Sequence, residues 1–232
     1  MQPVQFKQAR YDFVFLGMGL AGLSLLMRLL DSDKFRQKKM LLIDREPKTS
    51  NDRTWCFWEK GEGYFENIVH HRWPHISFLS EEYSSDLTIE PYEYKMIRAI
   101  DLYAYCLDRI AKYENVEWVY AGVEDWDWKE SKELCVQLNG ASYSLEADLV
   151  FNSMYTSRET PGSIGLLQHF KGWVIETEQP CFDKDRAIMM DFRVHQDHGT
   201  SFAYVLPVAE NDVLDVTVRD VLLATDATGN KS

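Results

Sequence analysis

The sequence predicts a mixed α/β fold in two parts, with strands and helices alternating over the first 160 residues and mainly strands after that. Three observations support this prediction. The apolar run 12–16 is followed by three glycines and by an apolar segment long enough for a helix. A second apolar run, 40–43, ends at an acidic residue. After Pro161 and Gly162, which mark a break, the apolar runs have the length of strands.

Periodicity assigns the individual elements. Residues 12–16 and 40–43 are predicted as buried strands, and 20–30 as a helix that is apolar on nearly all sides. Residues 101–113 are predicted as an amphipathic helix with Asp101 as its N-cap. Further strands are expected at 116–120, 134–138, 143–145, 149–151, 173–177, 187–193 and 202–206.

Composition limits the classes of protein. The chain has 232 residues, enough for one large domain or two small ones, and 45% are hydrophobic, as in a folded protein. A net charge of −12 argues against nucleic acid as a partner, because phosphate binding needs clustered Lys and Arg. The four cysteines are far apart and form no CxxC, which is typical of reduced thiols in a cytoplasmic protein.

The run 13–30 is the one candidate for a membrane-spanning segment, because it is 18 residues long and interrupted only by Arg28. Its three glycines and polar flanks fit a strand, a turn and a helix better. We therefore expect no membrane span here.

Gly17, Gly19 and Gly22 form a GxGxxG between the first strand and the first helix. The first glycine allows a tight turn, the second lets the backbone approach a pyrophosphate, and the third allows close packing of the helix. The helix N-terminus then points its N–H groups at the phosphates. Asp44 ends the next strand, where a carboxylate can bond a ribose hydroxyl. This order predicts a Rossmann-like dinucleotide site and does not separate FAD from NAD.

An aromatic segment, Asn51–Glu59, holds three large aromatic side chains beside Arg53. Composition favours a core segment. The alternative is an aromatic wall for a flat, apolar or cationic ligand.

Asp215 and Thr217 lie two residues apart on an alternating segment, so they share one face of a strand. That face of the strand is either exposed to solvent or lines a cavity. His70, His71 and His75 are interpreted as surface or loop residues, since Pro74 prevents a helix that would align two of them. No metal site is expected.

Together these motifs resemble the lycopene β-cyclases of bacterial carotenoid synthesis. The resemblance covers roughly residues 11–207, and its most specific parts are 51–59 and 190–193. The other matching segments are the GxGxxG, 42–47, 168–170, 172–173 and 202–207.

The resemblance implies a Rossmann-like FAD-binding half and a β-rich substrate half that is incomplete at the C-terminus. It implies reduced FAD as cofactor, with NAD(P)H as reductant, and lycopene or a similar acyclic carotenoid as substrate. The polyene ends would close into β-ionone rings through a carbocation, without net redox change. Because such a substrate lies in the bilayer, the protein would be cytoplasmic and associated with the membrane surface. The implied cofactor-binding residues are Gly17, Gly19, Leu20, Ala21, Gly22, Asp44, Arg45 and Arg53.

In the family, the Leu-Pro segment continues to an acidic residue, any residue and then Thr. Here the match is Asp215-Val216-Thr217, with a shorter carboxylate and a spacing one residue closer to Leu206-Pro207. Asp215 is therefore the expected proton donor or cation stabiliser, with Thr217 as its neighbour. Since family members continue well beyond this point, we expect a truncated or frameshifted member.

The expected domains are an FAD-binding domain, 1–160, a partial substrate domain, 161–218, and a disordered or atypical tail, 219–232. Residues 65–100 are also compatible with the substrate half. Two alternative functions remain open: a redox flavoenzyme, such as a monooxygenase acting on a lipophilic substrate, and an inactive FAD-binding remnant. The sequence does not indicate an oligomeric state.

Overall fold

The computed structural model describes residues 3–154, 166–197, 199–209 and 212–223. Of these, 166–170 and 212–223 are described as backbone only. The chain divides into two compact units, each made of two separate segments. The first unit combines Met1–Arg53 with Ala99–Ser157, and the second combines Thr54–Arg98 with Arg158–Ser232.

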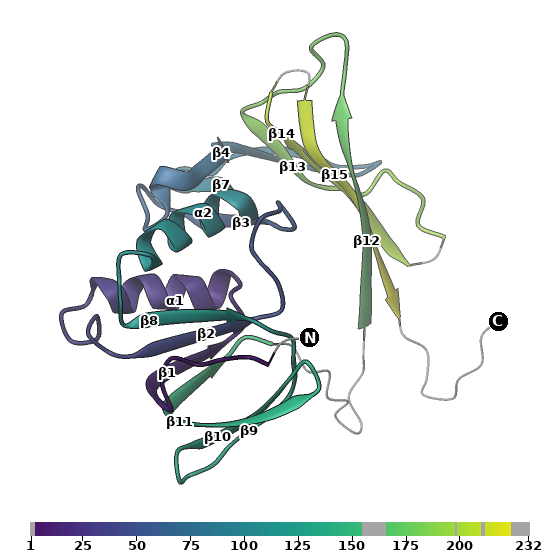
Figure 1. Cartoon of the computed structure of the whole chain (residues 1–232). Helices are drawn as coiled ribbons and strands as arrows, with labels where there is room; N and C mark the ends of the chain where they lie inside the picture. The colour runs from purple at the N-terminus through teal and green to yellow at the C-terminus, as the bar shows by residue number, and fades with distance from the viewer. Residues whose placement is uncertain (1–2, 155–165, 198, 210–211, 224–232) are drawn as a thin grey trace, which may run out of the picture. The chain divides into compact units, whose positions relative to one another are not determined.

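The first unit is a sheet with helices on one face (Figure 1). Its strands lie in the order β8-β2-β1-β11-β10-β9. The pairs β8–β2, β2–β1 and β1–β11 are parallel, whereas β10 pairs antiparallel with both β11 and β9. The elements are β1 (Arg10–Leu16), α1 (Leu20–Asp31), β2 (Met40–Asp44), α2 (Ala99–Ile110), β8 (Val116–Tyr120), β9 (Val123–Trp128), β10 (Glu133–Leu138) and β11 (Ala141–Asn152).

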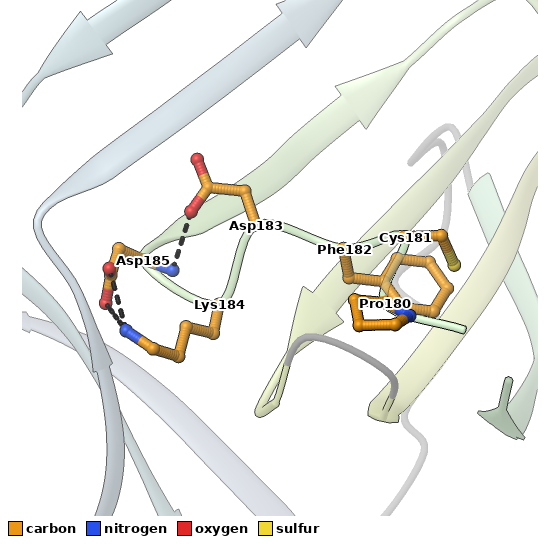
Figure 2. A pocket seen from close by; sticks show the side chains of 6 residues that line it. All are labelled: Pro180, Cys181, Phe182, Asp183, Lys184 and Asp185. Carbon is orange, nitrogen blue, oxygen red and sulfur yellow. Dashed lines mark hydrogen bonds and ion pairs between the residues drawn. The ribbon is translucent and has the colours of Figure 1, made fainter. Parts of the chain in front are cut away.

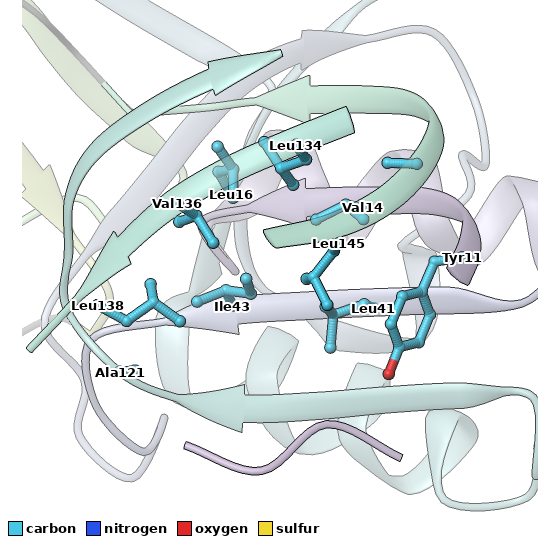
Figure 3. Close-up of a cluster of buried hydrophobic side chains, with 11 residues drawn as sticks. Tyr11, Val14, Leu16, Leu41, Ile43, Ala121, Leu134, Val136, Leu138 and Leu145 are labelled. Atoms are coloured by element: carbon cyan, nitrogen blue, oxygen red, sulfur yellow. The ribbon is translucent and has the colours of Figure 1, made fainter. Parts of the chain in front are cut away.

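A core of buried side chains is formed mainly by β1, β2, β10 and β11 of this sheet, as Figure 3 shows. Val14 and Leu16 of β1 contribute to it because alternate residues of a strand point to one face. Phe13 and Phe15, which are also buried, point to the other face. The remaining core residues are Tyr11, Leu41, Ile43, Ala121, Leu134, Val136, Leu138, Leu145 and Ala147.

Helix α1 buries Leu23, Leu26, Met27 and Leu30, which recur at the i, i+3, i+4, i+7 spacing of one helix face. The run 13–30 therefore forms part of a strand, a turn and a helix, as predicted. No helix among the described residues is long and apolar enough to cross a membrane.

The mixed α/β fold is confirmed, and the predicted strands 12–16, 40–43 and 116–120 match β1, β2 and β8 closely. Two details were wrong. Helix α2 begins at Ala99, so Asp101 lies in its first turn rather than at the N-cap. The strands expected at 143–145 and 149–151 are one continuous strand, β11, because it pairs with β10 along its first half and with β1 along its second.

The second unit contains two sheets. One has the order β3-β7-β4 and is antiparallel. The other has the order β12-β15-β14-β13-β5-β6, in which β5 and β13 are parallel. The elements are β3 (Thr54–Glu59), a 3₁₀ turn (Glu66–Ile68), β4 (Val69–Trp73), β5 (His75–Leu79), β6 (Ser84–Thr88), β7 (Glu93–Arg98), β12 (Leu166–Glu176), β13 (Arg186–Asp191), β14 (Thr200–Pro207) and β15 (Asp212–Leu223).

The segment Thr54–Arg98 belongs to this second unit, whereas the expected FAD-binding domain was 1–160, with 65–100 also compatible with the substrate half. The expected break at Pro161 and Gly162 lies outside the described residues. Strand β15 continues to Leu223, so strand pairing extends into the segment 219–232 that was expected to be a tail.

A buried lysine holds the loop between β3 and β4. Lys95 is fully buried, and its ammonium group lies 3.2 Å from Glu59, 2.7 Å from Glu66 and 2.5 Å from the carbonyl of Gly61. Burial alone would lower the pKa of Lys95, but its hydrogen bonds to Glu66 and Glu59 raise it. Glu66 also accepts a hydrogen bond from Arg72, at 2.7 Å. A buried charge is tolerated here because it is fully paired.

The hydrogen bond from Lys95 is the main reason that the pKa of Glu66 falls from 4.5 to about 2. A depressed carboxyl pKa adds stability above the unfolded-state value and loses it as pH falls through the folded-state value. We expect Glu66→Gln to lower the free energy of unfolding at pH 7 by about 3 kcal/mol, from the shift at ~1.4 kcal/mol per pKa unit.

This deficit should narrow as pH falls from 4.5 towards about 2. Urea unfolding at pH 7, 4 and 3 measures it, with the exposed Glu62→Gln as control. A deficit that is constant with pH would show that the Glu66 carboxylate does not carry this stability.

Candidate functional site

The glycine turn joins β1 to α1 in a conformation that suits glycine. Gly17 has φ of +100°, and its N–H donates to the carbonyl of Ile43 at 2.8 Å. A Cβ on Gly17 would lie 2.4 Å from the hydroxyl oxygen of Ser153, and one on Gly22 would lie 2.7 Å from the carbonyl oxygen of Gly17. The first and third glycines of the motif therefore serve the turn itself and the packing of the helix on it.

Gly19 is different, because a Cβ there would meet nothing within 4 Å. Gly19 is the N-cap of α1, and no side chain caps that end of the helix. The first turn of α1 carries no acidic residue. The space at Gly19 and the uncapped N-terminus fit a pyrophosphate, which accepts hydrogen bonds from backbone N–H groups and is favoured by the helix dipole.

Asp44 connects the end of β2 to this turn. Its Oδ2 accepts a hydrogen bond from the N–H of Met18 at 2.6 Å, and its backbone carbonyl accepts one from the N–H of Ala121 at 2.6 Å. Its Oδ1 lies 2.7 Å from the ammonium group of Lys48. The carboxylate thus lies beside the turn, at the carboxyl end of the parallel strands, where an open α/β sheet binds its ligands.

The other predicted cofactor residues differ in position. Leu20 and Ala21 are the first two residues of α1. Arg45 is exposed beside Gly122, whose Cβ would lie 3.9 Å from the Cγ of Arg45. Arg53 is exposed and ties the chain to the start of α2, because its carbonyl accepts the N–H of Ala99 at 2.9 Å.

Sequence reasoning missed Ser153, which follows β11. Its N–H and its hydroxyl both donate to the carbonyl of Leu16, each at 3.0 Å. Ser153 thus fixes the end of β1 from the side opposite to β2. The sequence gives no sign of this contact, since the two residues are 137 positions apart.

In the second unit, the aromatic segment forms a ladder across the β3-β7-β4 sheet. Trp58, Tyr94 and Trp73 are register partners on the three strands. The ring centroids of Trp58 and Tyr94 are 4.6 Å apart, and those of Trp73 and Tyr94 are 5.9 Å apart. Trp73 is fully buried, whereas Trp58 is 47% exposed. No residue of Asn51–Glu59 is fully buried, although Cys56 packs against the buried cluster that contains Trp73, so the segment borders the core rather than forming it. The indole of Trp58 is an accessible aromatic surface.

The ladder is anchored to β14 by two hydrogen bonds. The hydroxyls of Tyr94 and Tyr204 lie 2.6 Å apart, and the indole N–H of Trp73 donates to the carbonyl of Pro207 at 2.7 Å. Burial, and then the nearby Cys56 thiol and Tyr94 hydroxyl, raise the pKa of Tyr204. The Tyr204 hydroxyl thus stays protonated at neutral pH.

Strand β15 carries the predicted acid. In the β14–β15 pair, Asp215 is the register partner of Leu206, and Thr217 is the register partner of Tyr204. The side chains of Asp215 and Thr217 lie outside the described residues. Their roles therefore stay a prediction, and the backbone places them beside the strand that anchors the aromatic ladder.

The specific segment 190–193 forms a local ion pair. Arg193 donates through Nε and Nη2 to the two carboxylate oxygens of Asp191, at 2.8 and 2.7 Å. The guanidinium is the main reason that the pKa of Asp191 lies below its ordinary value. A cavity of about 640 Å³ opens beside Arg193, lined also by Ser80, Glu81, Glu82, Phe192, Val194, His195 and Gln196.

A smaller pocket of about 280 Å³ lies in the loop between β12 and β13 (Figure 2). Its charged groups bond to one another: Lys184 pairs with Asp185 at 2.9 Å, and the N–H of Asp185 donates to Asp183 at 3.0 Å. Pro180, Cys181 and Phe182 form its apolar part. Nothing in this pocket adds to the candidate site.

The histidines were predicted as surface or loop residues; they lie on strands, His70 is exposed, and His71 and His75 are partly buried. His70 and His71 are in β4, and His75 begins β5. His71 bonds to the carbonyl of Lys184 at 2.7 Å. Within the described residues, no group of three or more His, Cys, Asp or Glu side chains gathers as a metal site.

The sequence matches the model of the family described as lycopene cyclase protein over residues 12–218. The chain belongs to this family. The match extends from β1 through the aromatic ladder to the segment with Asp215 and Thr217. No curated protein matches the sequence.

Solved structures show which fold this family member shares. PqsL, a probable FAD-dependent monooxygenase from Pseudomonas aeruginosa, is 13% identical, with a TM-score of 0.62 over 91% of this chain and 61% of that one. The p-nitrophenol 4-monooxygenase PnpA from Pseudomonas putida is 14% identical, with a TM-score of 0.59 over 95% and 60%. The halogenase PltM, solved with phloroglucinol and FAD, is 13% identical, with a TM-score of 0.60 over 96% of this chain and 53% of that one. The chain thus spans about three fifths of PqsL and PnpA, and at these identities the likeness establishes the fold alone.

The open space at Gly19 leads to a prediction. We expect Gly19→Val to fold with an unfolding free energy within ~0.5 kcal/mol of the unchanged protein, since a side chain there meets no neighbour. The same side chain would fill the pyrophosphate position and weaken FAD binding at least ~tenfold. Titration of FAD fluorescence and urea unfolding measure the two effects.

Gly22→Val is the matched variant. Its Cβ would collide with the carbonyl of Gly17, so it should lose stability as well as binding. Unchanged FAD affinity in stably folded Gly19→Val would refute the assignment of this turn to the pyrophosphate.

Proposed function

We propose that this protein is a flavoprotein that closes the acyclic ends of lycopene, or of a similar carotenoid, into β-ionone rings without net oxidation or reduction. The observation that carries the proposal is the family match over residues 12–218, which spans both units. The dinucleotide turn supports the cofactor, and the aromatic ladder supports the reaction class.

The first unit would hold the ADP half of FAD. The pyrophosphate would lie at Gly19 and the N-terminus of α1, where there is space and no side chain competes. Asp44 would bond the ribose, and Arg45 and Arg53 would supply positive charge nearby. When bound and reduced by NAD(P)H, the flavin supplies an electron-rich ring that stabilises positive charge.

The reaction needs an acid, surroundings that stabilise a carbocation, and a base. A carboxylic acid adds its proton to a terminal C=C bond of the polyene, and a tertiary carbocation forms. The next C=C bond attacks the cation and closes the ring, and a base removes a proton, so the product is an isomer of the substrate. We assign the acid to Asp215, with Thr217 beside it in the sequence. Such an acid stays protonated near pH 7 only among apolar groups.

The aromatic ladder suits the cationic stage. The face of an indole attracts a cation with about 0.5–2 kcal/mol, depending on how far water is excluded. Trp58 offers such a face, since its ring is 47% exposed and its position is fixed by Tyr94. Apolar neighbours also keep water away from the cation, which water would otherwise trap as an alcohol.

A redox function on a lipophilic substrate is the second candidate. It is favoured by the fold shared with PqsL, a probable FAD-dependent monooxygenase. This alternative gives no reason for the specific match at 51–59. It predicts consumption of NAD(P)H and oxygen in proportion to product, whereas cyclisation predicts neither.

Cells that accumulate lycopene provide the test of function. Expression of the protein should yield carotenoids with β-ionone rings and the mass of lycopene. Asp215→Asn should reduce this product at least ~100-fold, because an amide cannot donate the proton, while FAD binding stays unchanged. Asp212→Asn, earlier on the same strand, is the control.

Chromatography with mass detection separates the outcomes. Oxygenated products would favour the redox alternative. Cyclised product that is equally abundant in Asp215→Asn would overturn the choice of acid.

A substrate in the bilayer requires contact with a membrane surface. We expect the purified protein to sediment in part with phosphatidylcholine vesicles and to be released by mild detergent. Protein that stays in the supernatant at every lipid concentration would contradict this proposal.

A further inference from the structure

Lys48 lies in the loop after β2 and pairs with the carboxylate that is expected to bind the cofactor's ribose. Its ammonium group is 2.7 Å from Oδ1 of Asp44. The side chains of Lys48 and Asp44 are only 13% and 11% exposed. Surface ion pairs contribute little, but a pair shielded to this degree keeps a defined geometry.

A second contact, with an aromatic ring that is itself hydrogen-bonded, holds Lys48 in place. Its ammonium group lies 5.5 Å from the centre of the Tyr103 ring, which belongs to α2. The Tyr103 hydroxyl in turn donates to Asp52 at 3.0 Å. Burial and then this hydrogen bond raise the pKa of Tyr103, so its hydroxyl remains a donor. Lys48 is therefore positioned by β2 on one side and by α2 on the other.

The hydrogen-bond inventory of Asp44 shows what Lys48 can add. Oδ1 pairs with Lys48 at 2.7 Å and accepts a longer hydrogen bond, at 3.4 Å, from the N–H of Glu46, whereas Oδ2 accepts one from the N–H of Met18 at 2.6 Å. A carboxylate oxygen can accept two hydrogen bonds, so Oδ2 can accept a ribose hydroxyl while Oδ1 keeps its pairing with Lys48. An ammonium group has three N–H donors, so Lys48 can donate to a ribose oxygen while it stays paired.

We propose that Lys48 is a specificity-determining residue of the dinucleotide site, which reads the 2′-hydroxyl of the adenosine ribose together with Asp44. Asp44 accepts the hydroxyl hydrogen, and Lys48 donates to the hydroxyl oxygen. This inference rests on the proposed function, because it assumes that an adenosine diphosphate moiety binds at the glycine turn.

The pair also sets what the site rejects. A 2′-phosphate would bring negative charge against Asp44, whose position is fixed by Met18 and whose charge Lys48 already balances. A neutral hydroxyl satisfies both groups without adding charge. We therefore expect the site to favour a plain ribose over a 2′-phosphorylated one.

Calorimetric titration with ADP, 2′-deoxy-ADP and 2′-phospho-ADP tests the inference. The unchanged protein should bind ADP about tenfold more tightly than 2′-deoxy-ADP, as expected for charge-assisted hydrogen bonds. Lys48→Met keeps the stem beside Tyr103 and removes the charge. It should weaken ADP binding about tenfold and 2′-deoxy-ADP binding less than about threefold. Lys39→Met, an exposed lysine just before β2, is the matched control.

The outcomes separate this inference from the cofactor proposal. No binding of ADP or FAD to the unchanged protein would refute the cofactor itself. Binding with no preference for ADP over 2′-deoxy-ADP would refute the role of Lys48, even if the variant fails to fold. An equal loss for both ligands in Lys48→Met would assign Lys48 a purely structural or long-range role. Tighter binding of 2′-phospho-ADP than of ADP would also overturn the inference.

Discussion

In the first unit, strand β1 lies between two parallel partners, β2 and β11, and this pairing determines where a ligand can bind. Parallel strands bring their carboxyl ends to one edge of the sheet, so the glycine turn, Asp44 and Ser153 meet there. Each contact at that edge constrains another. The Ser153 hydroxyl leaves no room for a side chain at Gly17, and the N–H of Met18 holds the Asp44 carboxylate in place by a hydrogen bond. Gly19 alone of the three glycines faces open space, which leaves it available for a ligand.

The second unit relies on interactions between strands from distant parts of the sequence. Lys95 joins β7 to Glu59 and Glu66, which fixes the loop that follows Trp58. Tyr94 joins the same strand to β14 through Tyr204. The aromatic ladder is thus held on both sides, so its rings have a defined position.

Much of the first unit could be predicted because its strands are buried on both faces and read as continuous apolar runs, such as residues 40–43. The strands of 54–98 were missed for the opposite reason. Strand β6 is largely exposed and polar, and β4 contains two histidines and an arginine, so neither shows a hydrophobic pattern. The GxGxxG and Asp44 were found because local order defines them. The contact of Ser153 with Leu16 was not found, because tertiary packing brings the two residues together. The Asp44–Lys48 pair was not found either, because a spacing of four residues predicts a contact only within a helix, and Lys48 lies in a loop.

The interleaved order of the two units affects how the chain can fold during synthesis. Thr54–Arg98 leaves the ribosome before its partners β13 and β14 exist, and β1 must wait for β11 to complete its sheet. Contacts between such distant segments form slowly, because the chain must first lose the entropy of a long loop. Until then the apolar faces of β5 and β7 stay uncovered, which is the condition in which nascent chains aggregate or recruit chaperones. Neither unit can therefore finish folding before the translation of the other has begun.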